Sequence, residues 1–151
     1  MLSRIATSLL LGLIVYSVVS RAKAEPPPVE VKDFVLNFEA ADGLALEAKL
    51  TVPADATAPA PVVFYVHGAG FRTYDNPISY GDADGQRRVE FFFDYLAREC
   101  ARRGLGFCRM SKRGCKALNQ FPWMKVDREV FANATPTVML GDYERCLNAL
   151  R

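Results

Sequence analysis

The segment 61–72, with the sequence PVVFYVHGAGFR, constrains the fold more than any other part of the chain. Residues 62–66 are apolar, and the run is too short for a typical helix. It predicts a strand buried on both faces, and therefore a sheet with helices above and below. The strand ends in His67-Gly68-Ala69-Gly70, where small residues let the backbone turn sharply and approach a ligand. Backbone N–H groups exposed at such a turn can stabilise a developing negative charge.

Two segments with alternating apolar residues, 29–39 and 44–52, precede this strand. They are joined by Ala40-Ala41-Asp42-Gly43, and alternation around an Asp-Gly turn predicts an antiparallel hairpin. We expect one face of the second strand to be apolar, carrying Leu44, Leu46, Ala48, Leu50 and Val52.

A strand–helix–strand unit follows the turn. Residues 89–103 predict a helix, because Phe92, Leu96 and Cys100 recur every four residues and Gly104 follows. With Tyr95 they would form its apolar stripe. Residues 105–110 predict the next strand, and this order predicts parallel pairing with the strand at 62–66.

The other segments predict two loops and a final helix. Residues 71–88 and 116–133 are expected to be loops. Thr135 followed by Pro136 is typical of a helix start, which predicts a helix over 136–151. The sequence thus predicts the α/β class, with a hairpin leading into parallel strands.

The strand followed by His67-Gly68-Ala69-Gly70 resembles the third strand and oxyanion loop of α/β-hydrolases. The sheet of α/β-hydrolases also begins with an antiparallel hairpin, as is predicted for residues 29–52 of this chain. The motif Asp-x-Arg-Gly, frequent after the fourth strand of the family, is kept in part as Arg113-Gly114, with Ser111 in place of Asp. The resemblance covers 31–151 and implies the N-terminal portion of an α/β-hydrolase fold. The portion is expected to be incomplete, since the nucleophile elbow G-x-S-x-G, the acid and the histidine base are absent from the sequence.

The resemblance also assigns roles to residues. The Ala69 N–H is the expected oxyanion-hole donor, with Gly68 and Gly70 providing the conformation and a second donor. His67, Arg113 and Gly114 belong to the structural motif. The loop after the turn borders the substrate pocket in the family, which makes its residues candidates for the pocket wall; the alternative is a solvated surface loop. These wall candidates are Phe71, Arg72 and Tyr74.

The implied activity is hydrolysis of a carboxylic ester through a serine acyl-enzyme, carried out by the full-length parent without a cofactor. Peptide-bond hydrolysis of the acyl-peptidase kind is an alternative, as is a catalytically inactive truncated protein or binding module. The partner would be a small-molecule ester or peptide substrate. Ser79 and Ser111 are poor nucleophile candidates, because Ser79 follows no strand and no helix begins directly after Ser111. His67, the sole histidine, is expected to support the turn rather than act as base.

Residues 1–24 have the layout of a secretory signal peptide. An apolar stretch, 5–19, follows Arg4, and Ala22-Lys23-Ala24 fits a cleavage site. Cleavage after Ala24 predicts a secreted or periplasmic protein whose domain spans 25–151. The alternative, an uncleaved anchor, is disfavoured because the apolar stretch is shorter than the ~20 residues needed to cross a bilayer.

Charge and cysteine content exclude some partners. The net charge is +2 over the whole chain. The sequence contains no basic cluster with interleaved aromatic residues, so binding to nucleic acid is not expected. Four cysteines in an exported domain allow disulfides in three full pairings; the alternative is buried free thiols. Their spacing does not resemble a zinc site, so no metal is expected. The four are Cys100, Cys108, Cys115 and Cys146.

Overall fold

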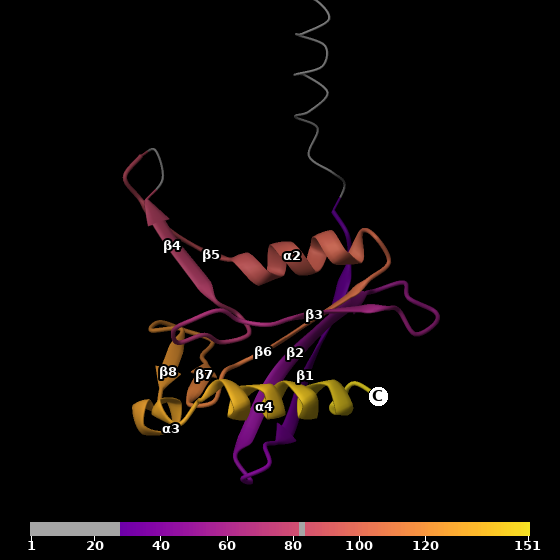
Figure 1. The fold of residues 1–151 in the computed structure, drawn as a ribbon. Coiled ribbons are helices and arrows are strands. Elements are labelled where there is room, and N and C mark those ends of the chain that lie inside the picture. The colour runs from indigo at the N-terminus through magenta and orange to yellow at the C-terminus, as the bar shows by residue number, and fades with distance from the viewer. Residues whose placement is uncertain (1–27, 82–83) are drawn as a thin grey trace, which may run out of the picture.

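The computed structural model describes residues 28–81 and 84–151 (Figure 1). The expected signal peptide lies outside the described residues. The described elements, in chain order, are β1 (Val31–Glu39), β2 (Ala45–Pro53), β3 (Val62–Tyr65), β4 (Pro77–Gly81), β5 (Arg87–Phe91), α2 (Phe92–Ala101), β6 (Gly106–Met110), β7 (Cys115–Ala117), β8 (Met124–Val126), α3 (Arg128–Ala132) and α4 (Pro136–Ala149).

A four-stranded mixed sheet with the order β1-β2-β6-β3 forms the centre. β1 and β2 pair antiparallel around the Asp42-Gly43 turn, which confirms the predicted hairpin. β6 pairs antiparallel with β2 and parallel with β3, so the predicted parallel pair is also confirmed. A mixed sheet of this kind, with helices packed on it, belongs to the α/β class.

Helices cover both faces of this sheet (Figure 1). On one face, Cys108 and Met110 of β6 pack in a core cluster with Tyr143 and Cys146 of α4. On the other face, Phe107 packs with residues of α2. Because side chains alternate along a strand, neighbouring residues of β6 face different layers. The predicted three-layer arrangement is therefore confirmed.

β3 is less buried than the sequence predicts. Val62 and Val63 are each 41% exposed, and Phe64 and Tyr65 are half-buried. The expectation of a strand buried on both faces is therefore wrong. The physical reason is position, because β3 is an edge strand of the described sheet, with β6 as its neighbour.

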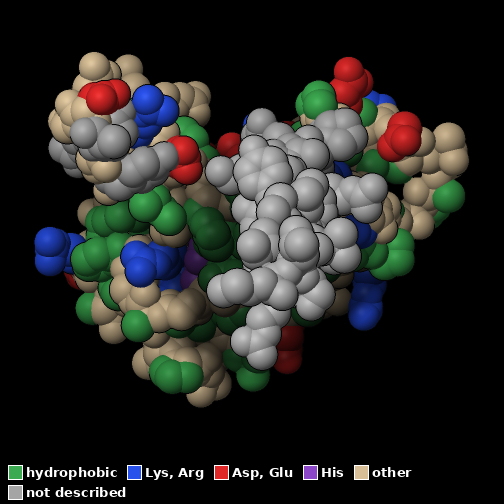
Figure 2. Space-filling model, turned by 90° about the horizontal axis from the view of Figure 1, so that it is seen from above, with side chains coloured by type: hydrophobic (Ala, Val, Ile, Leu, Met, Phe, Trp, Pro, Cys, Tyr) green, Lys and Arg blue, Asp and Glu red, His purple; other side chains and the backbone are tan. Residues whose placement is uncertain are grey.

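α2 forms a helix as predicted, but only part of its predicted apolar stripe faces the sheet. It begins at Phe92, and its buried face consists of Phe93, Ala97 and Ala101. Leu96 and Cys100 are partly buried and pack against this core cluster, whereas Phe92 is 41% exposed and Tyr95 60% exposed. The small side chains of the two alanines let the helix lie close to the sheet. Seen from the side that carries α2, the surface shows hydrophobic side chains beside basic ones (Figure 2).

Both predicted loops contain regular structure, so these two predictions are wrong. β4 and β5 form an antiparallel hairpin that projects from the sheet (Figure 1). Residues 116–133 contain most of the β7–β8 hairpin and the short helix α3. The strands are short and rich in polar residues, so their alternation gives a weak sequence signal.

The C-terminal helix forms as predicted. The Thr135 hydroxyl accepts a hydrogen bond from the Val138 amide at 3.3 Å, and Pro136 occupies the first turn. Within the described residues, no helix is long and apolar enough to span a membrane.

Candidate functional site

The turn at 67–70 lies at the carboxyl end of β3. Gly68, Ala69 and Gly70 are exposed, whereas His67 is buried. Gly70 has a φ of +83°, in the left-handed region that favours glycine. No backbone carbonyl of the described residues accepts a hydrogen bond from the amides of these three residues. The turn therefore offers N–H donors that an external acceptor can use.

His67 fixes the start of this turn. Its ring packs against Tyr65 and Phe93, with centroid distances of 5.3 and 5.2 Å. Burial lowers the pKa of His67 to about 4, and the charges of Lys112 and Arg72 also act in that direction. The imidazole is therefore neutral at pH 7. A general base works best with a pKa near the operating pH, so this environment suits a positioning role.

Lys112 is the residue of this site that sequence reasoning missed. It follows β6 and is buried, and its ammonium donates a hydrogen bond to the Gly68 carbonyl. Its amide also donates to the Arg72 carbonyl at 3.0 Å. Burial lowers the pKa of Lys112, and so does the Arg72 charge. A sequence signal existed, because the carboxyl ends of parallel neighbours such as β3 and β6 meet at one edge of a sheet.

Arg72 lies directly beside the turn. Its Nη1 atom donates to the Phe71 carbonyl at 2.9 Å. The same atom is 3.8 Å from where a Cβ on Gly70 would lie, and Arg72 is exposed. Two cationic side chains therefore border the free amides, and no carboxylate of the described residues forms an ion pair with either.

The other two predicted wall residues are anchored to the protein. The Phe71 ring packs on Phe131 of α3, with a centroid distance of 4.5 Å, and beneath the Arg128 guanidinium at 5.5 Å. The Tyr74 carbonyl accepts a hydrogen bond from Arg109 Nε at 3.1 Å. These contacts hold both ends of the segment that follows the turn.

The two candidate serines occupy different surroundings. Ser111 is buried, its hydroxyl accepts a hydrogen bond from the Tyr74 amide at 3.2 Å, and its own amide donates to the Glu47 carbonyl. Ser79 is exposed and lies in β4, within the projecting hairpin. The structure does not pair either hydroxyl with His67, whose Nε2 atom is buried without a partner among the described residues.

Arg113 clamps three elements together. Its Nε and Nη2 atoms donate to the two oxygens of Asp142 in α4, at 2.9 and 2.7 Å. Its Nη1 atom donates to Asp42 in the β1–β2 turn at 2.8 Å. The hydrogen bond to Asp142 contributes most to the raised pKa of Arg113. Asp142 could be foreseen only weakly from sequence, as an acidic residue on a helix face that also carries Cys146.

Position 114, directly after Arg113, requires a glycine. It has a φ of +75°, and a Cβ there would lie 2.6 Å from the Asp127 carbonyl oxygen and 2.8 Å from the Phe131 amide nitrogen. Only glycine fits this close approach of two backbone segments.

A charged network under α2 holds the loop after the turn on the sheet. Arg109 is fully buried and bonds Asp94 at 2.9 Å and Thr51 at 2.6 Å. Lys49 lies 3.3 Å from both Asp33 and Asp75. Sequence reasoning placed residues 105–110 in an apolar strand and did not foresee this network. Its cations all meet carboxylates, so it is electrostatically satisfied.

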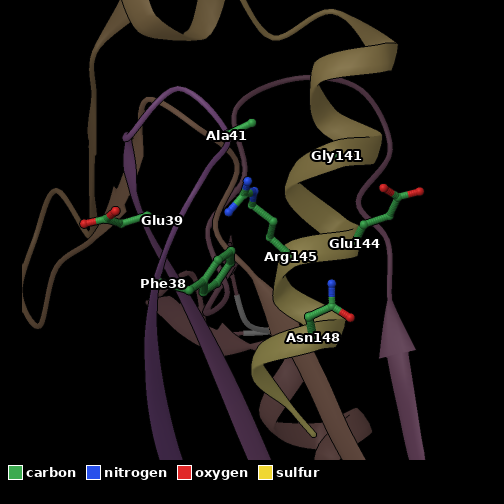
Figure 3. A pocket seen from close by; sticks show the side chains of 7 residues that line it. All are labelled: Phe38, Glu39, Ala41, Gly141, Glu144, Arg145 and Asn148. Carbon is green, nitrogen blue, oxygen red and sulfur yellow. The ribbon is translucent and has the colours of Figure 1, made fainter.

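A pocket of about 760 Å³ lies elsewhere, between the β1–β2 hairpin and α4 (Figure 3). Phe38 and Arg145 point into the space between these elements, whereas Glu39 and Glu144 point away from it (Figure 3). None of the predicted site residues lines this pocket.

All four cysteines are free thiols. Cys108 and Cys146 are fully buried in one core cluster, and the interaction between their thiols lowers the pKa of Cys108 and raises that of Cys146. The described residues contain no group of three or more histidine, cysteine or acidic side chains that could hold a metal.

Comparisons of the chain with protein-family models, with curated proteins and with solved structures find no match. The case for a function therefore depends on the geometry of the turn and its two neighbouring cations.

Proposed function

We propose that this chain carries the oxyanion-binding portion of a carboxylic-ester hydrolase that works through a serine acyl-enzyme. The observation that carries the proposal is the exposed turn Gly68–Gly70 after β3, whose amides are free of backbone acceptors within the described residues. Ester hydrolysis passes through a tetrahedral oxyanion, and preorganised N–H donors stabilise that charge. One such donor contributes about 3 kcal/mol of transition-state stabilisation.

The local electrostatics support this role. Lys112 and Arg72 place positive charge beside the amides, and Lys112 holds the Gly68 carbonyl. Because the Lys112 ammonium binds the Gly68 carbonyl oxygen, it partly neutralises the negative end of that peptide dipole. A developing negative charge at the turn would therefore meet N–H groups and cations together.

The fold supports the proposal at a coarser level. An antiparallel hairpin joined to a parallel pair, with helices on both faces, is compatible with the opening part of an α/β-hydrolase domain. Arg113 and Gly114 hold the segment after β6 in place beside the turn.

The proposal assigns the nucleophile to a serine outside the described residues. Ser111 is buried and hydrogen-bonded to the loop, and Ser79 lies in the projecting β4–β5 hairpin. The same acyl-enzyme chemistry would serve a peptidase of the acyl-peptidase kind, so ester and peptide substrates share this site.

The test uses the natural full-length polypeptide with p-nitrophenyl acetate and butyrate, alongside a fluorophosphonate probe. We expect labelling of a serine outside 28–151. Ala69→Pro removes one N–H donor and should lower kcat by about 10²- to 10³-fold. Ala69→Gly is the matched control, because it keeps the N–H and should retain most activity.

Two results would contradict the proposal. Absence of both turnover and labelling would refute the hydrolase function. Equal activity of the Ala69→Pro and Ala69→Gly variants would show that the Ala69 amide does not contact the oxyanion.

A further inference from the structure

We propose that the turn Gly68–Gly70, together with Lys112 and Arg72, binds a stable oxyanion group of a small-molecule ligand, such as a carboxylate or a phosphate. The inference deepens the proposed function and rests on it for the identity of the site, because it adds that the ligand itself is anionic. It concerns binding in the ground state, which requires no nucleophile.

The charge of Lys112, which has no ion-pair partner among the described residues, favours an anion at this site. Charged side chains are rarely buried without a partner, because desolvation of the ion is costly. Lys112 is 5% exposed, and the acceptor of its ammonium is the neutral Gly68 carbonyl. By contrast, Lys49, Arg109 and Arg113 each lie within ion-pair distance of carboxylates. Within the part of the chain that the structure describes, Lys112 has no such counter-charge.

The N–H donors of the turn are the second feature that favours an anion. Lys112 engages the Gly68 carbonyl, and the adjacent amides have no backbone acceptor in 28–81 or 84–151. Successive amides around a left-handed residue such as Gly70 form the concave donor arrangement that binds anions. Arg72 lies against Gly70, and a guanidinium can donate two parallel hydrogen bonds to a carboxylate or phosphate.

The positive sign of the neighbouring charges is the third feature that favours an anion. The titratable groups that act on Lys112 are Arg72 and the Cys115 thiol, and those that act on His67 are Lys112 and Arg72. His67 is neutral at pH 7, and the nearby Phe71 ring carries a further cation, Arg128, on its face. An anion at the turn would therefore offset the positive charges of Lys112 and Arg72, with Arg128 nearby.

The site is open, which sets the size of the group it can take. Gly68, Ala69, Gly70 and Arg72 are all exposed, so one oxyanion group can reach the donors while the rest of the ligand stays outside the turn. A small ligand that carries a carboxylate or a phosphate fits this geometry.

The test is a titration of the isotopically labelled full chain with inorganic phosphate and, separately, with acetate at constant ionic strength, followed by amide NMR. We expect saturable shifts centred on the amides of Gly68, Ala69 and Gly70. Tighter binding of phosphate would indicate a phosphate-bearing ligand, and tighter binding of acetate would indicate a carboxylate; both outcomes support the site.

Variants identify the cations involved. Arg72→Gln should weaken binding about tenfold, as expected for one charge-assisted contact. Lys112→Met should also weaken it, because the variant removes the positive charge that the ammonium places on the Gly68 carbonyl. Arg72 is exposed, so its replacement leaves the fold intact even if the Lys112 variant unfolds. Lys116→Gln is the control, because this cation is 66% exposed, lies on β7 and faces Glu47 at 3.8 Å.

The inference is wrong if the shifts do not saturate, if they scatter over the surface, or if Lys116→Gln weakens binding as much as Arg72→Gln. If neither phosphate nor acetate binds while esterase turnover is observed, the anion site is contradicted and the proposed hydrolase function stands. Binding without any turnover or serine labelling would remove the proposed function and leave the anion site.

Discussion

His67 shows how a single residue links the turn to the core. Its ring packs between Tyr65 and Phe93, and its Nε2 atom is buried without a partner within the described residues. The cost of charging such a ring explains why burial lowers its pKa. The sequence identified His67 as part of the turn motif, but only its neighbours reveal that it is neutral and lies in the sheet–helix interface.

The first prediction concerns the pH dependence of stability. The pKa of His67 falls from 6.5 to about 4 on folding, so between these pH values the unfolded state binds more protons. The free energy of unfolding should therefore decrease as the pH falls from 6.5 to 4, by up to about 3 kcal/mol from this residue. Urea unfolding of the wild type and of His67→Gln measures it. The variant should show a shallower slope in this range, and identical slopes would contradict the account.

The second prediction compares two glycines with similar φ. Gly114→Ala would place a Cβ 2.6 Å from the Asp127 carbonyl oxygen, whereas the same change at Gly43 meets nothing within 4 Å. Gly43 has a φ of +81°, so both variants carry left-handed strain of about 1 kcal/mol. We expect Gly114→Ala to lower the free energy of unfolding by at least about 2 kcal/mol more than Gly43→Ala. Equal losses in chemical denaturation would show that the close approach does not constrain this position.

At the level of elements, the sequence predicts those helices and strands whose ends are marked by a local turn or capping motif. The Asp-Gly hairpin turn and the Thr135-Pro136 helix start both identify their elements correctly. In α2, the burial of Phe93 rather than Phe92 could not be predicted, because the two residues are adjacent and equally apolar. Which of them faces the sheet depends on the contact with Phe107 and Tyr65, which the sequence of the helix does not contain. The β4–β5 and β7–β8 hairpins could not be predicted, because β7 and β8 have three residues each and β4 and β5 are rich in polar residues.

The positions of α2 and α4 on opposite faces of the sheet favour one of the cysteine pairings that the sequence left open. Cys108 packs in one core cluster with Cys146 of α4, whereas Cys100 belongs to α2 on the other face of the sheet. A pair between Cys108 and Cys100 would have to pass through the sheet. The structure therefore makes Cys108 and Cys146 the pair most easily joined.

The third prediction follows from this contact. During refolding with oxidised glutathione, Cys108 and Cys146 should form an S–S bond, as both thiols lose a proton and two electrons pass to glutathione disulfide. Tryptic digestion should then link peptides 104–109 and 146–151. The bond should raise the free energy of unfolding by about 3–4 kcal/mol, as expected for a loop of this length.

Two variants control this experiment. Cys146→Ser should abolish both the linked peptide and the stability difference between oxidised and reduced protein. The double variant Cys100→Ser/Cys115→Ser should keep both. A cross-link that contains Cys100 or Cys115 in the wild type would contradict the described packing.

At the level of the whole molecule, the site is assembled at the edge where β3 and β6 end. The turn could be predicted from a single stretch of sequence, because strand, small residues and histidine are contiguous there. Lys112 could not, because its relation to Gly68 depends on the parallel pairing of β3 with β6. Neither could the burial of Ser111, which depends on the path of the loop through Tyr74. Residues far apart in the chain therefore give the turn its charge.

The measurement that tests the central claim most directly is a crystal structure of the natural full-length polypeptide after reaction with a fluorophosphonate. The phosphonyl group mimics the tetrahedral intermediate, so its oxygen marks the position of the oxyanion. The account predicts that this oxygen lies about 2.7–3.1 Å from the Ala69 amide nitrogen. An adduct whose phosphonyl oxygen is held by other donors, away from Gly68–Gly70, would contradict it.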